Sequence, residues 1–354
     1  MNADVEKAVQ KVLFIVVFAS SLFLVLTYLL SMGLGMLVFF STVEGLNFSR
    51  ASLSLHPLFI RDIEVTVNAG LYFVFLWSVF ALCFVAAWNY RRSLHNRIRE
   101  FVSDATTRSL FRNNLLAMPA ITSMLLVAII VLDHLQMRAG IQTGELGLSD
   151  PFFDFILVSQ APLTEEIVFR IVPIGTFLAI YVFLVGKSTK PEFSRVRRLK
   201  TCFLALLQPE TAKKAVGLKT IGEGGLFGGV IWAEWVMVLL TATFFGIAHY
   251  LGGWGPGKIS EAAVSGTVFA LAYLYYGIQA PILLHWFFNY YFFVFDLSLS
   301  YLAETNFLSF SWSASILFGT LLWVVVIIFG AVYISKVLMK KFKAAPVSEP
   351  PLGG

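Results

Sequence analysis

The chain has 354 residues, of which 58% are hydrophobic, 16% aromatic and only 13% charged. Soluble domains average about 45–50% apolar and about 25% charged residues, so this composition excludes a water-soluble globular protein, a disordered chain and a disulfide scaffold. The formal net charge is +5. Because the basic residues cluster between apolar segments, membrane topology explains them better than nucleic-acid binding does, and we expect no nucleic-acid partner.

Eight apolar segments are long enough to cross a bilayer as helices. In chain order they are about 12–40, 69–90, 114–135, 152–186, 226–251, 259–277, 279–300 and 312–335. Their continuous apolarity, without a polar/apolar alternation, predicts helices rather than a β-barrel. The expected fold is therefore an all-α polytopic membrane protein. Residues 1–343 would form a single transmembrane helical domain, and residues 344–354 a disordered tail.

The distribution of positive charge predicts the orientation of these spans. Of the 26 Lys and Arg residues, 21 fall on the side that holds both termini, four fall on the other side, and Arg170 lies within a span. The positive-inside rule then places both termini in the cytoplasm, with the protein in the cell membrane of a prokaryote or the endoplasmic reticulum of a eukaryote. The basic loop of about 187–225 contains a stretch, 194–207, that suits either a helix on anionic membrane lipids or a solvated loop.

Charges in the middle of a span are costly and indicate function. Glu165, Glu166 and Arg170 form one such cluster in the fourth span. Residues four apart share a helix face, so Glu166 and Arg170 can form an internal ion pair. Glu165 is rotated by about 100° from Glu166 and stays free to face another group.

Three further polar groups occur in later spans, namely His249, His285 and Asn289. His285 and Asn289 share a helix face, and Phe245 shares the face of His249. One carboxylate, two imidazoles and one carboxamide suit peptide-bond hydrolysis. The carboxylate can act as general base on water, one histidine can orient that water, and the other histidine with the amide can donate to the tetrahedral oxyanion.

These residues resemble the three ordered motifs of a known protease family. The motifs are Glu165-Glu166-x-x-x-Arg170, Phe245-x-x-x-His249 and His285-x-x-x-Asn289, with flanking runs AHYLGG and ALAYLYYGIQAPILLHWFFN. They are similar to those of the CAAX protease and bacteriocin-processing (CPBP) family, which consists of intramembrane glutamic endopeptidases and includes the type II CAAX prenyl proteases. The similarity covers about residues 155–295, the expected catalytic core.

The resemblance implies a role for each residue. Glu165 and His249 would activate water, and His285 with Asn289 would form the oxyanion hole. Glu166 and Arg170 would be supporting residues. We assign Phe245 to substrate binding, with packing as the alternative. The substrate would be a membrane-associated protein or peptide, with prenylated CAAX peptides as the family's precedent, and neither a cofactor nor a metal is expected.

Other functions fit parts of the pattern. Buried Glu, His and Arg residues also occur in proton-coupled transporters, although no inverted repeat is visible. A zinc-dependent protease with Glu165, His249 and His285 as ligands is a second alternative, and a catalytically silent membrane scaffold is a third. The spans also pose a geometric difficulty. His249 lies close to one end of its span, whereas the span that holds His285 begins at the opposite face of the membrane. The helices must therefore tilt or break for the two residues to meet.

Overall fold

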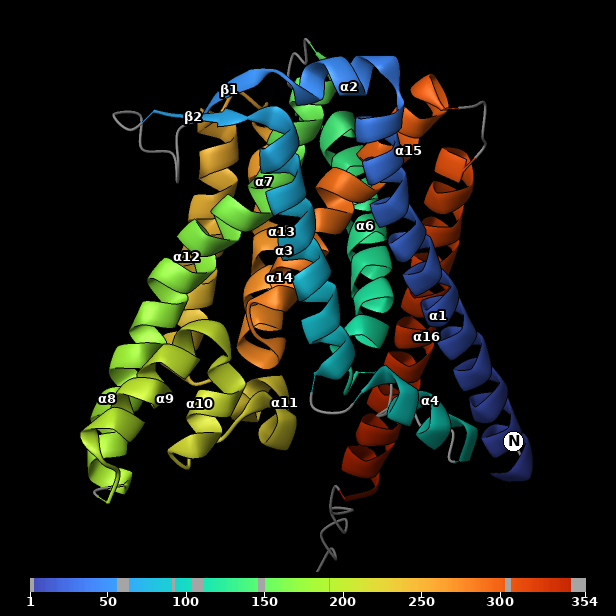
Figure 1. Ribbon diagram of the computed structural model, residues 1–354. Helices are drawn as coiled ribbons and strands as arrows, with labels where there is room; N and C mark the ends of the chain where they lie inside the picture. Colours follow the sequence, from blue (N-terminus) through green and yellow to red (C-terminus); the bar gives the residue numbers. More distant parts are fainter. Residues whose placement is uncertain are drawn as a thin grey trace, which may run out of the picture.

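The computed structural model describes residues 3–55, 64–90, 93–103, 111–145, 150–190, 192–302 and 307–344, which form a bundle of long helices (Figure 1). Within these residues, seven helices are long and apolar enough to cross a membrane. The chain is thus an all-α, multi-pass integral membrane protein, as predicted. The seven spans lie in α1 (Ala3–Ser41), α3 (Ala69–Asn89), α6 (Asn114–Arg138), the α7–α8 helix, α12 (Trp232–Leu251), the α14–α15 helix and α16 (Phe307–Ala344).

The eighth predicted span, 259–277, is helix α13 (Gly257–Tyr276). It is as long as α12 and lies against it inside the bundle (Figure 1). Its sequence includes Lys258, Glu261 and several Ser, Gly and Tyr residues, which make it less apolar than the seven spans. The single-domain boundary at 343 stays a prediction, and the tail beyond Ala344 lies outside the described residues.

The two ends of the bundle carry different elements (Figure 1). The end that we call the basic end holds the start of α1, α4 (Leu94–Ser103), α9 (Arg195–Leu207), α10 (Pro209–Ala215), α11 (Ile221–Gly229) and the end of α16. The opposite end, which we call the hairpin end, holds α2 (Val43–Ser49), β1 (Ser52–Leu55), β2 (Val65–Asn68) and the turn between α12 and α13. Strands β1 and β2 pair antiparallel, with Ser52 opposite Asn68.

The predicted span 226–251 is wrong at its beginning, because the helix starts only at Trp232. The glycine-rich run before it forms the separate helix α11, in which Gly225 adopts a positive φ of 68°. The chain is extended at Val230 and Ile231, and the Glu234 side chain accepts a hydrogen bond from the Ile231 amide at 2.7 Å. This cap fixes the start of α12. The stretch 194–207 is helical. A helix was one of the two structures predicted for it, and a solvated loop was the other.

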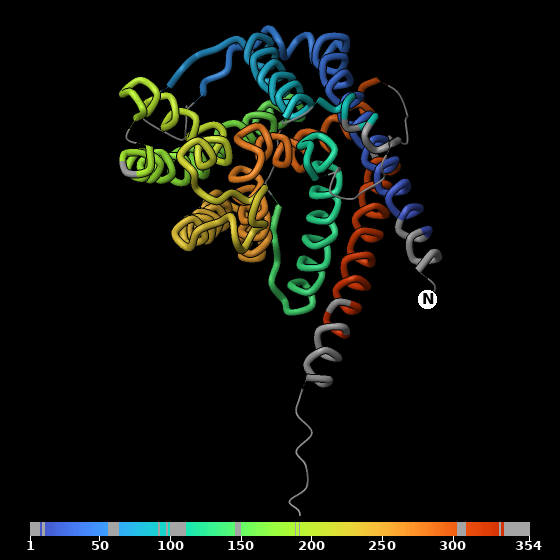
Figure 2. The backbone as a smooth tube through the Cα atoms, turned by 90° about the horizontal axis from the view of Figure 1, so that it is seen from below, coloured from blue at the N-terminus to red at the C-terminus, as the bar shows by residue number. Residues whose placement is uncertain are grey.

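Buried apolar side chains form two cores. Figure 2 shows the helices that carry them from below. The larger core joins α1, α3, α6 and α16 to α7 and α14–α15, whereas the smaller core lies among α8, α9, α10, α12 and α13. Helix α14 (Gln279–Trp286) lies between the two groups (Figure 2). The sequence-predicted site residues lie on elements of both groups, so the site is held from two sides.

Candidate active site

The fourth span changes its helix type directly after the two glutamates. Helix α7 (Pro151–Glu166) continues without interruption into the π-helix η2 (Ile167–Gly175) and then into α8 (Thr176–Thr189). The Thr176 amide bonds to the Ile171 carbonyl five residues back, and Pro173 lies inside η2 without an amide proton to donate. Such π-helical turns often mark functional sites. Here the turn sets the direction of Arg170 relative to Glu165 and Glu166.

The seventh predicted span shows the same change beside its polar residues. Helix α14 ends at Trp286, η3 (Phe287–Tyr291) is π-helical, and α15 (Phe292–Tyr301) resumes the α-helix. His285 therefore lies at the end of α14, and Asn289 lies in η3. Both spans therefore change from α-helix to π-helix beside their polar groups, without an interruption of the helix.

A close approach of α12 and α13 brings His249 into the site. Gly246 packs directly against the backbone of Ile259, and a Cβ on it would lie only 2.2 Å from the Ile259 carbonyl oxygen. His249 follows three residues later and bonds through Nδ1 to the Phe245 carbonyl oxygen at 2.8 Å. Nδ1 must donate in this contact, so Nε2 of a neutral ring keeps its lone pair and points towards the carboxylate of Glu165.

On one side of the site, every charged group has a charged or polar neighbour. Arg170 Nε lies 3.1 Å from Glu166 Oε2, and both side chains are fully buried. The other carboxylate oxygen of Glu166 lies 3.0 Å from His285 Nδ1. The guanidinium of Arg170 also lies over the ring of Phe245, with its central carbon 4.7 Å from the ring centroid. The expected Glu166–Arg170 pair is therefore present, and Glu166 also connects Arg170 to His285.

On the other side, the carboxylate of Glu165 has a freer oxygen. Among the described residues, Glu165 Oε2 has no hydrogen-bond partner. It lies 4.0 Å from His249 Nε2 and 3.8 Å from His285 Nε2. The side chains of Glu165 and His249 are 17% and 18% exposed, whereas that of His285 is 5% exposed. Three groups from three separate helices thus converge on one partly accessible point.

Asn289 completes the cluster. Its side-chain amide nitrogen lies 3.3 Å from His285 Nε2. His285 is thus engaged at both ring nitrogens, by Glu166 at Nδ1 and by Asn289 at Nε2. The ring of Phe269 also stacks on the imidazole, with 5.4 Å between ring centroids and an interplanar angle of 28°. The His285 ring is therefore fixed in place more firmly than the ring of His249.

Phe245 lies in the wall of the site. Its ring packs edge-to-face against His249 at 4.6 Å and against His285 at 5.8 Å between centroids. It is only 2% exposed. The side chain therefore packs against both histidines, and its contact with substrate stays a prediction.

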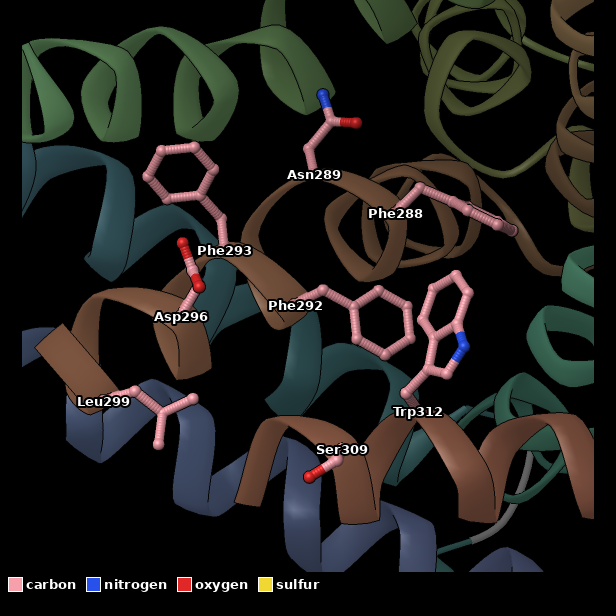
Figure 3. A pocket seen from close by; sticks show the side chains of 8 residues that line it. All are labelled: Phe288, Asn289, Phe292, Phe293, Asp296, Leu299, Ser309 and Trp312. Carbon is pink, nitrogen blue, oxygen red and sulfur yellow. The ribbon is translucent and has the colours of Figure 1, made fainter. Parts of the chain in front are cut away.

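The structure adds features that the sequence motifs did not indicate. One is the Glu166–His285 contact, between residues 119 positions apart, and another is the stacking of Phe269 on His285. A third is a cleft of about 570 Å³ between η3–α15 and the start of α16, shown in Figure 3. It is lined by Phe288, Asn289, Phe292, Phe293, Asp296, Leu299, Ser309 and Trp312. Asn289 lines the cleft and also contacts His285.

The geometry also bears on the zinc alternative. Among the described residues, no group of three or more His, Cys, Asp or Glu side chains is arranged to hold a metal ion. The reason is visible at His285, whose two ring nitrogens both contact protein groups. A catalytic zinc usually has three protein ligands, and this contact pattern leaves only Glu165 and the Nε2 atom of His249.

Comparison with known proteins identifies the segment that carries the site. Residues 148–291 match the family described as type II CAAX prenyl endopeptidase Rce1-like. This part of the chain is therefore similar to an Rce1-like domain. No curated protein and no solved structure matches the chain. The matching segment contains Glu165, His249, His285 and Asn289, and it spans from just before α7 to the end of η3. This similarity to a CPBP-type family implies an intramembrane protease.

Proposed function

We propose that the protein is an intramembrane endopeptidase that hydrolyses a peptide bond of a membrane-associated protein, with Glu165 as general base. The observation that carries this proposal is the position of Glu165 Oε2, which lies unpaired among the described residues and about 4 Å from two imidazole nitrogens. A water bound beside this oxygen would be within hydrogen-bond reach of His249 Nε2 as well.

In the proposed reaction, the water oxygen attacks the carbonyl carbon of the scissile bond as Glu165 takes a proton from the water. His249 orients the water through Nε2, which the Nδ1 contact with Phe245 leaves free to accept. The carbonyl oxygen becomes an oxyanion. When the tetrahedral intermediate collapses, the carbon–nitrogen bond breaks, and the proton held by Glu165 passes to the leaving amine.

We infer that Asn289 and His285 stabilise the oxyanion. The Asn289 amide can donate directly. His285 donates from Nε2 only when its ring is protonated, because Nδ1 already donates to Glu166. The carboxylate of Glu166 orients the His285 ring, as the carboxylate beside a catalytic histidine does in serine proteases. Arg170 in turn holds Glu166 in position from the opposite side.

Purified protein in detergent tests this function. We expect it to cleave fluorogenic peptides that carry an apolar membrane-associating segment, with each cut at a defined bond identified by mass spectrometry. Glu165→Gln serves as the inactive control and Glu223→Gln, an exposed carboxylate on α11, as the matched active control. Cleavage that persists unchanged in Glu165→Gln would contradict the proposal. The proposal would also be contradicted if folded wild-type protein cleaved none of the membrane proteins of the cells that produce it.

A further inference from the structure

Helix α9 presents an apolar stripe on its outer face. The stripe consists of Val196, Leu199, Phe203 and Leu207, which follow one another at spacings of three or four residues and so share one face of the helix. Their side chains are 63%, 66%, 63% and 36% exposed. Ala205, on the opposite face, is fully buried. The stripe therefore points away from the part of the protein that the structure describes.

Two other short helices at the basic end have the arrangement usual for a surface that faces water. Helix α10 exposes Thr211 and Lys214, and α4 buries Leu94 while it exposes His95 and Arg99. Both thus turn polar side chains outwards, whereas α9 turns apolar ones outwards. Contact with water does not explain the stripe, because neighbouring exposed apolar side chains mark a surface that another apolar surface covers.

The segment that joins the fourth span to α9 is rich in positive charge. This span ends at Lys187, and residues 187–200 contain six basic residues but only one acidic residue, Glu192. The basic residues are Lys187, Lys190, Arg195, Arg197, Arg198 and Lys200. A cluster of this size, directly beside a membrane span and on an amphipathic helix, is typical of a site for anionic lipid headgroups.

Two of these basic residues flank the apolar stripe. At about 100° per residue, Arg195 lies beside Leu199 on one edge and Lys200 lies beside Leu207 on the other edge. Both basic side chains are exposed. Their long aliphatic stems can lie along the stripe while their charges reach the level of the lipid phosphates. An apolar face with basic flanks is the pattern of a helix that lies in a membrane interface.

The position of α9 brings the stripe within reach of the bilayer. Helix α9 lies beside the lower part of α8 (Figure 1), and the two helices share the smaller core through Leu178 and Ala205. On α8, Ile180 and Leu184 are exposed within a membrane span, so they face lipid. A helix that packs directly on this lipid-facing helix can contact the same leaflet.

Exposed aromatic side chains at the same end indicate where the membrane interface lies. Trp232 is the first residue of the α12 span and is 77% exposed. Tryptophan is enriched at the level where the bilayer meets water. Helices α9, α10 and α11 lie at the end of the bundle from which α12 starts (Figure 1). The short helices are therefore near the headgroup level.

We propose that α9 is an interfacial helix that binds anionic phospholipid. Its apolar stripe lies among the acyl chains, and the basic residues around Arg195 and Lys200 bind the headgroup phosphates at the basic end. None of these residues belongs to the polar cluster of the candidate active site, so the tests require no assay of catalysis.

Fluorescence quenching tests where the stripe lies. Leu199 and Phe203 are replaced singly by cysteine in a variant whose Cys83 and Cys202 are replaced by alanine, and each new cysteine is labelled with bimane. The labelled protein is placed in nanodiscs of phosphatidylcholine and phosphatidylglycerol. The quencher is either bromine on the lipid acyl chains or iodide in the buffer.

Two further cysteines calibrate this measurement. Ile180→Cys on α8 is the lipid-facing reference, and Lys214→Cys, 71% exposed on α10, is the water-facing reference. We expect brominated lipid to quench both stripe positions as strongly as the α8 reference and several-fold more than the α10 reference. Quenching by iodide, as at the α10 reference, would show a solvated face and overturn the proposal. Quenching by neither agent would also overturn it, because protein, such as a second copy of the chain, would then cover the stripe.

Lipid binding by the chain with its own cysteines tests the headgroup. Dioleoylphosphatidylglycerol or dioleoylphosphatidylcholine is titrated into the protein in detergent, and bound lipid is counted by native mass spectrometry. We expect wild type to bind the anionic lipid more tightly. The double variant Arg195→Gln/Lys200→Gln should weaken that binding by about fivefold for each charge removed, and leave phosphatidylcholine binding unchanged.

The matched control removes two charges from the same end but outside α9. Lys214 and Lys219 are both exposed, and Lys214→Gln/Lys219→Gln should keep the preference of wild type for phosphatidylglycerol. An equal loss in the two double variants would refute the assignment of the site to α9. A wild type without any preference for the anionic lipid would refute the headgroup site itself.

Discussion

The neighbouring residues Glu165 and Glu166 lie on two different sides of the site. The two sides differ in the partners that they offer to each carboxylate. On the closed side, Glu166 is fully buried and contacts both Arg170 and His285. On the open side, Glu165 is 17% exposed, and its Oε2 lies 4.0 Å from His249 Nε2 and 3.8 Å from His285 Nε2, whereas Glu166 Oε2 lies 3.1 Å from Arg170 Nε. Two residues of identical chemistry, one position apart, thus lie in opposite environments.

The difference follows from simple requirements. A carboxylate buried beside an arginine needs that partner, because an uncompensated charge inside the bilayer is costly. A general base must instead keep an oxygen available for the proton it removes. The rotation of about 100° between successive residues separates the two functions, and the π-helix after Glu166 keeps Arg170 on the closed side. We expect substitutions on the two sides to affect different properties.

The largest effect on catalysis is expected for Glu165→Gln. The amide keeps the shape of the side chain but cannot take a proton from water, so turnover should fall to background while the melting temperature in detergent stays close to that of wild type. Peptide cleavage and differential scanning fluorimetry measure the two properties. Glu223→Gln on α11 is the matched control and should leave both unchanged. Activity within a few fold of wild type would remove Glu165 from the role of base.

Glu166→Gln is expected to lower stability most. The change leaves the buried Arg170 guanidinium without its carboxylate, and breaking a buried ion pair costs about 3–5 kcal/mol. The melting temperature in detergent should therefore drop strongly, with a loss of activity that follows the loss of the His285 contact.

A double variant sharpens this comparison. In Glu166→Gln combined with Arg170→Met, no charge is left unpaired on the closed side, so much of the stability should return. Activity should not return, because His285 still lacks its carboxylate partner. If activity recovered together with the melting temperature, Glu166 would act through stability alone.

The sequence predicted most of the fold because apolar length is a strong signal in a membrane protein. The start of α12 was missed, because the break there depends on the backbone of Gly225 and on the cap from Glu234, neither of which changes the apolarity of the run. The less apolar α13 was predicted as a span, although hydropathy alone does not rank it with the other seven.

The site was predictable where one helix holds both partners and hidden where two helices meet. Spacing of four residues indicated the Glu166–Arg170 pair and the shared face of His285 and Asn289. No spacing rule reaches from Glu166 to His285, because that contact depends on how α7 packs against α14. The roles of Glu165, His249, His285 and Asn289 in catalysis stay predictions.

Asn289→Ala tests a residue of the open side that also lines the cleft. Loss of one oxyanion donor typically lowers kcat by about 10²–10³. We expect a fall in kcat of this size with little change in KM, since the interaction strengthens in the transition state. Asn89→Ala, which removes an amide at the end of α3, is the matched control. An unchanged kcat with a raised KM would assign Asn289 to ground-state binding, as a residue that lines the cleft.

The smallest effect is expected from metal removal. His285 uses Nδ1 for Glu166 and Nε2 for Asn289, and His249 uses Nδ1 for the Phe245 carbonyl. Only the Nε2 atom of His249 and the carboxylate of Glu165 remain for a metal, fewer than the three protein ligands usual at a catalytic zinc. Exhaustive chelation should therefore leave the cleavage rate of wild type unchanged.

Metal analysis of the chelated protein completes this test. We expect an active sample with no stoichiometric zinc. If the activity were lost with the metal and restored by adding zinc, His285 would have to turn away from Glu166 and Asn289 to become a ligand. Glu166→Gln would then weaken zinc binding as well, because a carboxylate that orients a ligating histidine supports its affinity for metal. Under the glutamic mechanism, the same variant changes stability and rate and is indifferent to added zinc.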